Sequence, residues 1–280
     1  MLLLMFAKHL QELGIEGMAD AMAEMGFDGV DLTVREGGSI APQDAKALLP
    51  KAVKAFERRG LCVGMLTTSI VSAEDEYANE IVSVASDLGI KFIKLGYWRY
   101  DKFGTLRERI EEVRRCLSGL EKMAEKYDIT FGVHTHSGNF ITCDGAITFM
   151  LVDGFPSERI CVYIDPGHMT IEGGLSGWRA CIDLLRDYIR MVAVKDFAWR
   201  SVRDESTGVV KWYVEPAPLA EGITRWHEVF ECLSQIGFDG VVSVHSEYAH
   251  METAQIIEQT KVDLQYLRPI IEQTLLKGVS

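Results

Sequence analysis

The segment Thr130-Phe-Gly-Val-His-Thr-His136, the helical pattern over 145–153 and the segment Cys161-Val-Tyr-Ile-Asp165 decide the fold. The first and last segments are short and nearly continuous in apolar residues. Such runs are typical of strands that are buried on both faces of a parallel sheet. A helical segment between two buried strands therefore predicts a parallel β-α-β unit in the middle of the chain.

The same alternation extends over the whole chain. Eight apolar runs predict strands: Leu2–Ala7, Gly29–Thr33, Cys62–Thr67, Phe92–Gly96, Thr130–His136, Cys161–Asp165, Met191–Asp196 and Val241–His245. The first run is rich in Leu and Met and carries the weakest strand signal. Eight amphipathic segments predict helices: Ile15–Met25, Asp44–Arg59, Asp75–Leu88, Leu106–Tyr127, Gly145–Asp153, Trp178–Tyr188, Trp226–Gln235 and Thr253–Leu275. In the second segment, Pro50 predicts a kink or a late start.

Eight strand-then-helix units without a linker predict an α/β fold, a single (β/α)8 TIM barrel over residues 1–280. An open doubly wound sheet is the alternative, but it needs a glycine-rich phosphate loop. The chain contains neither GxGxxG nor GxxxxGK[ST]. One connection is unusually long, because Pro, Gly, charged and aromatic residues mix over 197–222. We expect a lid loop there, after the seventh barrel strand.

Composition excludes several classes of protein. The chain has 280 residues, 48% of them hydrophobic and 25% charged, which excludes disorder, collagen and coiled coil. Its net charge of −12 makes nucleic acid an unfavourable partner. No apolar stretch approaches the roughly 20 residues of a membrane span, and the N-terminus lacks a basic region and a cleavage site. Six scattered cysteines without a CxxC pair fit a cytoplasmic protein.

Histidines concentrate where a barrel keeps its active site. Catalytic residues of a TIM barrel come from the C-terminal ends of its strands and the loops that follow. Four of the seven histidines fall at or just beyond the ends of the fifth, sixth and eighth predicted strands: His134, His136, His168 and His245. This clustering is the main sequence signal for a site.

Charged residues join the histidines at these strand ends. Lys195 ends the seventh strand, and a buried lysine needs a carboxylate or a substrate anion as its partner. Glu247 shares the inward parity of His245. Asp165 could stabilise a turn through its side chain or belong to the site. Asp196 could pair with Lys195 or face the helices.

Besides His136 and Asp196, four other residues are candidates for substrate binding. Arg35 follows the second strand and could meet a substrate anion, while Glu172 is expected in the loop after the sixth strand. Trp98 and Trp199 also follow strand ends. Their rings could wall a sugar or polyol, or they could serve as hydrophobic lids.

Three motifs together resemble the sugar phosphate isomerase/epimerase superfamily, the xylose-isomerase-like TIM barrels. They are Asp165-Pro-Gly-His168, Val194-Lys-Asp196 and Gly237-Phe-Asp-Gly-Val241, of which the last repeats the junction at 26–30. The resemblance covers nearly the whole chain. It implies a divalent metal (manganese, magnesium or zinc) held by Glu, Asp, His and Glu, and two glutamates that move protons beside a substrate carbonyl.

Matched position by position, this chain departs from the pattern of that superfamily. Asp165 matches the metal aspartate, His168 its companion and His136 the histidine of the Glu-Asn-His motif. The two glutamates become His134 and His245, and the metal histidine becomes Ala193. The resemblance thus implies a metal set of His134, Asp165 and His245, which divalent metals accept. An alignment shifted by two residues uses His136 and Glu247 instead.

The resemblance implies an isomerase or epimerase of a small sugar, polyol or related hydroxy-carbonyl compound. Proton abstraction next to the carbonyl needs a base, for which Glu247, His134 and His245 are candidates. A metal, or Lys195 with His168, would stabilise the oxyanion. The alternatives are a dehydratase acting on a keto-polyol or keto acid, and a sugar-binding barrel without activity. Relatives suggest a homo-dimer or homo-tetramer. The net charge and the missing ligands argue against an endonuclease.

Overall fold

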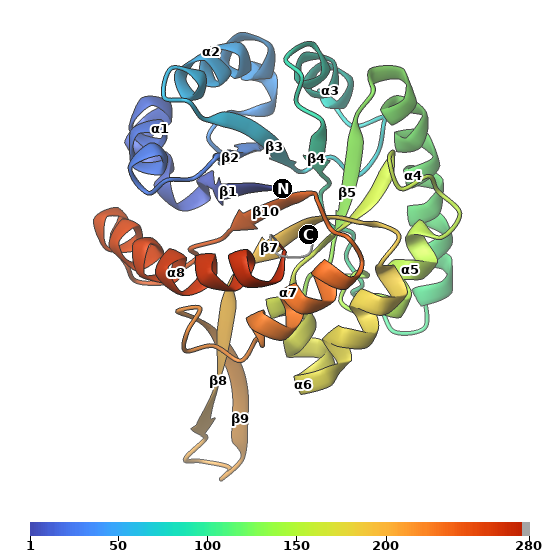
Figure 1. Ribbon diagram of the computed structural model, residues 1–280. Helices are drawn as coiled ribbons and strands as arrows, with labels where there is room; N and C mark the ends of the chain where they lie inside the picture. Colours follow the sequence, from blue (N-terminus) through green and yellow to red (C-terminus); the bar gives the residue numbers. More distant parts are fainter. Residues whose placement is uncertain (276–280) are drawn as a thin grey trace.

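The computed structural model describes residues 1–275 and confirms the closed parallel barrel (Figure 1). Its strands follow in the order β1-β10-β7-β6-β5-β4-β3-β2. They are β1 (Leu2–Phe6), β2 (Gly29–Val34), β3 (Cys62–Thr68), β4 (Phe92–Lys94), β5 (Thr130–His134), β6 (Ile160–Ile164), β7 (Ile189–Val194) and β10 (Val241–Val244). Parallel pairing of β1 with both β10 and β2 closes the ring, so the weak first run is a strand and the open-sheet alternative is wrong.

Eight α-helices surround the barrel, with short 3-10 turns at η1 (Ala7–Leu13) and η2 (Pro42–Asp44). They are α1 (Gly14–Glu24), α2 (Ala45–Glu57), α3 (Ala78–Asp87), α4 (Leu106–Tyr127), α5 (Gly145–Val152), α6 (Pro166–Leu185), α7 (Trp226–Gln235) and α8 (Thr253–Thr274). Helix α2 contains Pro50 and does not start late. No helix within residues 1–275 is both long and apolar enough to cross a membrane.

Helix α6 starts twelve residues before the predicted Trp178, directly after the sixth strand. Asp165 is its N-cap, because Oδ1 accepts a hydrogen bond from the backbone N–H of His168 at 3.0 Å. Pro166 occupies the first turn, where its missing N–H costs nothing. Gly174 interrupts the helix with φ 65°. The prediction that placed Glu172 in a loop is therefore wrong, because this residue lies in the helix.

The inside of the barrel is layered. Alternate strand residues point inward, and those near the N-terminal ends form an apolar cluster of Leu4, Met65, Cys161, Tyr163, Met191, Ala193 and Val241. Toward the C-terminal ends the inward positions become polar, with Asp31, Lys94 and His134 all buried. The apolar layer fills the lower barrel, so a ligand can enter only from the C-terminal end.

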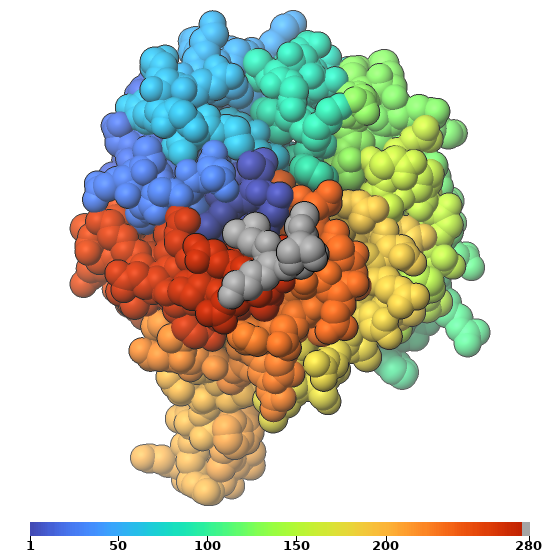
Figure 2. Space-filling view, viewed as in Figure 1, coloured from blue at the N-terminus to red at the C-terminus, as the bar shows by residue number. Residues whose placement is uncertain are grey.

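A hairpin replaces most of the lid loop expected at 197–222. Strands β8 (Asp196–Arg203) and β9 (Val210–Ala217) pair antiparallel, and the hairpin projects from the barrel (Figures 1 and 2). The mixed composition hid two strands rich in Val and aromatic residues around the turn at 204–209. Closure of this segment over a ligand stays a prediction.

Asp196 anchors the hairpin to helix α7. Its Oδ1 accepts hydrogen bonds from the backbone N–H and the hydroxyl of Thr224, at 3.0 and 2.8 Å. Its Oδ2 accepts one from the indole N–H of Trp226 at 2.8 Å. Because these donors satisfy the buried carboxylate, Asp196 has a structural role. The prediction that it binds substrate is not supported by this placement.

Gly167 lets the start of α6 approach the end of β7. A Cβ atom there would lie 2.6 Å from the backbone carbonyl oxygen of Lys195, a contact that only a backbone shift can relieve. We expect Gly167→Ala to lower the free energy of unfolding by about 1–3 kcal/mol, measured by urea denaturation. Gly177→Ala in the same helix is the control, because a Cβ there meets no atom within 4 Å. An equally stable Gly167→Ala variant would contradict the tight contact.

Candidate active site

A cavity of about 170 Å³ opens at the C-terminal ends of the barrel strands. Phe6, Lys8, Arg35, Thr67, Lys94, Tyr97, His134, His136, Tyr163, Lys195, His245 and Glu247 line it. Four of these side chains are lysine or arginine and only one is a carboxylate. The cavity therefore offers excess positive charge in a protein whose net charge is −12.

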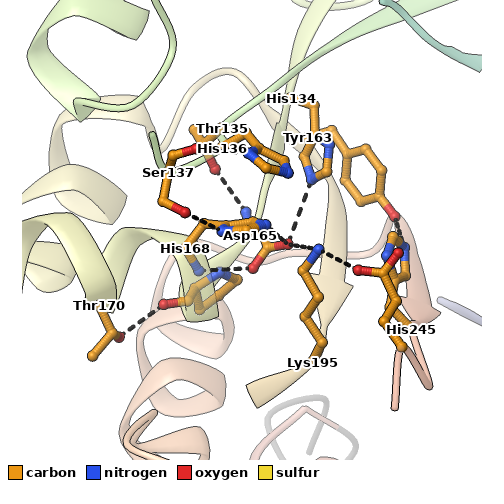
Figure 3. Close-up of polar contacts among 12 residues, drawn as sticks. His134, Thr135, His136, Ser137, Tyr163, Asp165, His168, Thr170, Lys195 and His245 are labelled. Atoms are coloured by element: carbon orange, nitrogen blue, oxygen red, sulfur yellow. Dashed lines mark hydrogen bonds and ion pairs between the residues drawn. The ribbon is translucent and has the colours of Figure 1, made fainter. Parts of the chain in front are cut away.

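Six of the residues singled out in the sequence line this cavity: Arg35, His134, His136, Lys195, His245 and Glu247. Asp165 lies directly behind the wall, with no exposed surface. Its Oδ2 is 3.6 Å from His134 Nε2 and 3.3 Å from Lys195 Nζ (Figure 3). The strand-end reasoning thus brought the correct neighbours together.

Five other predicted residues do not line the cavity. His168 is buried behind Asp165 and hydrogen-bonds to Ser137 Oγ through Nδ1 at 2.7 Å. Glu172 accepts a hydrogen bond from the backbone N–H of Gly138 at 2.8 Å. The remaining three are Asp196, which anchors the hairpin, Trp98, which is buried away from the cavity, and Trp199, which lies on β8 with 44% of its surface exposed. Their expected contacts with substrate are not supported by this geometry.

The sequence reasoning missed six lining residues: Phe6, Lys8, Thr67, Lys94, Tyr97 and Tyr163. A signal for some of them was present. Lys94 ends β4 just as His134 ends β5, and Thr67 pairs with Lys94 in the barrel register. The parity rule that selected the histidines would also have selected Thr67 on the third strand and Lys94 on the fourth, but it was not applied to these strands.

Lys195 bridges the two carboxylates of the site. Its Nζ lies 2.9 Å from Glu247 Oε2 and 3.3 Å from Asp165 Oδ2 (Figure 3). Burial alone would lower the pKa of Lys195, but Asp165 and Glu247 outweigh burial and raise it. Burial alone would likewise raise the pKa values of both carboxyls, and Lys195 instead holds them below their usual range. All three groups are therefore charged at neutral pH.

His134 is neutral and held from both sides. Its Nδ1 hydrogen-bonds with the hydroxyl of Tyr97 at 2.8 Å, and its ring stacks on Tyr163 with centroids 4.4 Å apart. Burial lowers the pKa of His134 well below 6.5, more than the neighbouring Asp165 raises it. Its Nε2 has no hydrogen-bond partner among the described residues. This nitrogen is buried and faces Asp165 Oδ2 at 3.6 Å.

His245 also has a tyrosine and an aspartate as partners. Its Nε2 hydrogen-bonds with the Tyr163 hydroxyl at 2.8 Å and lies 3.8 Å from Asp31 Oδ2. Burial lowers the pKa of His245 well below 6.5. Its Nδ1 is buried without a hydrogen-bond partner within residues 1–275. The ring centroids of His134 and His245 are 6.4 Å apart, so two neutral imidazoles border one cavity.

Asp31 is the buried carboxyl group next to His245. It accepts hydrogen bonds from the hydroxyls of Thr67 at 2.7 Å and Ser243 at 3.0 Å. Burial raises the pKa of Asp31 to about 6, against the opposing effect of these hydrogen bonds. The carboxyl therefore titrates close to neutral pH.

The donor set does not fit the metal expected from the sequence. His245 faces Tyr163 and Asp31, so His134, Asp165 and His245 do not converge. Lys195 Nζ is nearer to Asp165 Oδ2 than the imidazole nitrogens of His134 and His168, which lie at 3.6 and 3.8 Å. The described part of the chain holds no group of three or more His, Cys, Asp or Glu residues arranged for a metal ion. Among the described residues, the cation nearest to Asp165 Oδ2 is the Lys195 ammonium.

The raised pKa of Asp31 makes stability depend on pH. The folded state binds this proton more tightly than the unfolded state, so its contribution is greatest below the unfolded pKa of 3.8 and is lost as the pH rises through about 6. We expect Asp31→Asn to gain thermal stability relative to wild type as the pH rises from about 5 to about 7.5, measured by differential scanning calorimetry. Asp183→Asn, at a side chain that is 78% exposed, is the control. A constant difference over this range would contradict the assignment.

Solved structures with the same fold include several sugar epimerases. The chain is similar to a 3-keto-D-glucoside 4-epimerase from E. coli, with a TM-score of 0.72 and 16% identity, covering 96% of this chain and 99% of that chain. A probable 3-DHS dehydratase from Bacillus anthracis has a TM-score of 0.68 and 16% identity over 94% and 98% of the two chains. At these identities the similarity shows the fold alone.

A third neighbour, a xylose isomerase-like TIM barrel protein from Mycobacterium smegmatis, was solved in complex with magnesium. It has a TM-score of 0.66 and 14% identity, covering 96% of this chain and 97% of that chain. No curated protein matches the sequence significantly. The family match is direct and extends over residues 19–270. The chain belongs to the family of xylose isomerase-like TIM barrels.

Proposed function

We propose that the protein is an isomerase or epimerase that moves a proton next to the carbonyl group of a small sugar or related hydroxy-carbonyl compound. The observation that carries this proposal is the pair of neutral imidazoles, His134 and His245, 6.4 Å apart on one cavity. They stand at the two positions where the family resemblance expects glutamates. Each is a base that can take a proton and return it.

The surroundings of each histidine suit proton exchange. His134 has Asp165 at 3.6 Å and the Tyr97 hydroxyl at 2.8 Å. An adjacent carboxylate stabilises the imidazolium that forms when the ring takes a proton. His245 has the same kinds of partner, in Asp31 and Tyr163. Glu247 is engaged by Lys195 at 2.9 Å, so the proposal assigns proton transfer to the two histidines.

Lys195 supplies the positive charge that an enolate oxygen needs. It is fixed by two carboxylates and lines the cavity. Charge that is already oriented in a buried site stabilises a developing oxyanion without reorganisation. In this proposal Lys195 takes the role that the resemblance assigns to manganese, magnesium or zinc, because the donor geometry places the ammonium at Asp165.

The cavity favours a small polar substrate. Its volume of about 170 Å³ is below the roughly 300 Å³ typical of pockets for drug-sized ligands. Tyr97, Thr67 and His136 offer polar contacts for hydroxyl groups. Arg35 lines the cavity and makes no ion pair in the described chain, so it can receive a carboxylate or phosphate of the substrate.

Dehydration of a keto-polyol or keto acid is the second candidate. It begins with the same proton abstraction and then needs an acid for the departing hydroxyl. The Tyr97 hydroxyl, hydrogen-bonded to His134 and lining the cavity, favours this reading. Loss of water from the product mass would identify a dehydratase. Thermal stabilisation by a sugar without any turnover would identify a binding protein.

Two expectations from the sequence stay predictions. A homo-dimer or homo-tetramer is expected from the family resemblance. A cytoplasmic location is expected from the cysteines, all six of which are unpaired in the structure.

Deuterium exchange tests the two-base proposal. In D2O, with a panel of ketoses and keto acids followed by NMR, the wild type should interconvert two compounds and place deuterium on the carbon next to the carbonyl. We expect His134→Asn and His245→Asn each to slow interconversion by about 10²-fold or more. Each variant should still exchange the proton of one configuration, and the two variants should exchange opposite ones, because each keeps one base.

The matched control for this experiment is His227→Asn. His227 lies on α7 and pairs with Glu231 at the surface, where 55% of its side chain is exposed. This variant should interconvert the substrate at the wild-type rate. Full interconversion by either His134→Asn or His245→Asn would sink the two-base proposal.

A further inference from the structure

We propose that Lys94 is an amine nucleophile that forms an imine with the carbonyl group of the substrate. This inference rests on the substrate class of the proposed function, a small hydroxy-ketone or hydroxy-aldehyde. It names a covalent step at a residue that the proton exchange between His134 and His245 does not require.

Lys94 lines the cavity from the end of a barrel strand. It is the last residue of β4, and the barrel register pairs it with Thr67 on one side and Gly132 on the other. Its side chain is only 2% exposed, yet it lines the same cavity as the two histidines. The amine is therefore shielded from bulk water and open to a ligand in the cavity.

Lys94 differs from Lys195 in its partners. Lys195 has two carboxylates within 3.3 Å. Lys94 Nζ makes no ion pair within residues 1–275, and its close neighbour is the ring of Tyr97, whose centroid is 3.6 Å away. One cavity thus holds a lysine that is fixed as a cation and a lysine without a counter-ion.

The electrostatic surroundings of Lys94 favour its neutral amine over the ammonium. Burial lowers its pKa well below 10.5, and the positive charges of Arg35 and Lys195 lower it further. The more distant carboxylates Asp31 and Glu247 act in the opposite direction and do not compensate. A lysine that is desolvated and lies near other cations carries a free lone pair more often than an exposed lysine does, and this form is the nucleophile.

The covalent step needs only the substrate and protons. The lone pair of Lys94 Nζ forms a C–N bond to the carbonyl carbon, the C=O π pair moves to oxygen, and a proton passes from the nitrogen to that oxygen, which gives a neutral carbinolamine. After the oxygen is protonated once more it leaves as water, and the nitrogen lone pair forms the C=N bond of the protonated imine. Hydrolysis of the imine at the end returns the water and the free amine.

The protonated imine makes proton exchange easier. When His134 or His245 removes the neighbouring proton, the C–H electron pair forms a C=C bond and the C=N pair moves to nitrogen, which gives a neutral enamine. Reprotonation of carbon by an imidazole restores the imine. The imine nitrogen on Lys94 thus accepts the electron pair that the broken C–H bond releases.

Reductive trapping tests this inference. The protein is incubated with dihydroxyacetone or D-fructose and sodium cyanoborohydride, which reduces an imine to a stable amine. We expect the intact mass to rise by the mass of the compound less one oxygen atom, and peptide mapping to place the label on Lys94. Lys195 in the same cavity is the internal comparison, and Lys94 should carry at least about tenfold more label because its pKa is lowered whereas that of Lys195 is raised.

Lys94→Met is the matched variant, since methionine keeps much of the side-chain volume and has no amine. It should lose the specific label, and its thermal midpoint shows whether it folds. If the variant does not fold, the peptide map of the wild-type protein still shows whether Lys94 carries the label. Label on Lys195, or spread over exposed lysines with none on Lys94, would overturn the inference. The trapping experiment is repeated with a His134→Asn, His245→Asn double variant. Imine formation does not need these histidines, so label on Lys94 in this variant supports the imine whether or not the two-base proposal holds.

Discussion

The ion triplet of Asp165, Lys195 and Glu247 is the interaction on which the rest of the site depends. A buried lysine without partners would lose its charge, and two buried carboxylates without a cation would take up protons. Together, at 3.3 and 2.9 Å, the three groups keep all their charges in the barrel mouth. Asp165 also caps α6. Removal of Lys195 would leave the carboxylate of Asp165 buried without its cation, which is strongly destabilising.

The other basic groups of the cavity are shaped mainly by burial. Burial lowers the pKa values of His134, His245 and Lys94, and the neighbouring carboxylates do not compensate. Perturbed groups that meet in one cavity mark a functional site. The apolar layer below them closes the lower barrel. The result is a small cavity in which Lys195 is fixed as a cation beside three basic groups with lowered pKa values.

Much of the fold could be predicted from the sequence, because barrel strands and helices have distinct periods. Helices α4 and α7 begin and end at the predicted residues. The first twelve residues of helix α6 and the pairing of the hairpin β8–β9 were missed. A side-chain cap and a projecting hairpin leave only weak local signals in the sequence. In the site, strand-end histidines were found, while Lys94 was overlooked. The partners of His245 depend on which way its ring turns, which no spacing reveals.

The central claim, that Lys195 and not a metal is the cation at Asp165, is tested most directly by metal content. Purified protein is incubated with manganese, zinc or magnesium, dialysed and measured by plasma mass spectrometry. The ammonium 3.3 Å from Asp165 Oδ2 predicts far less than one tightly held metal per chain under every condition. About one metal per chain, lost in the His134→Ala variant, would contradict the claim and return the site to the metal set that the sequence resemblance implies.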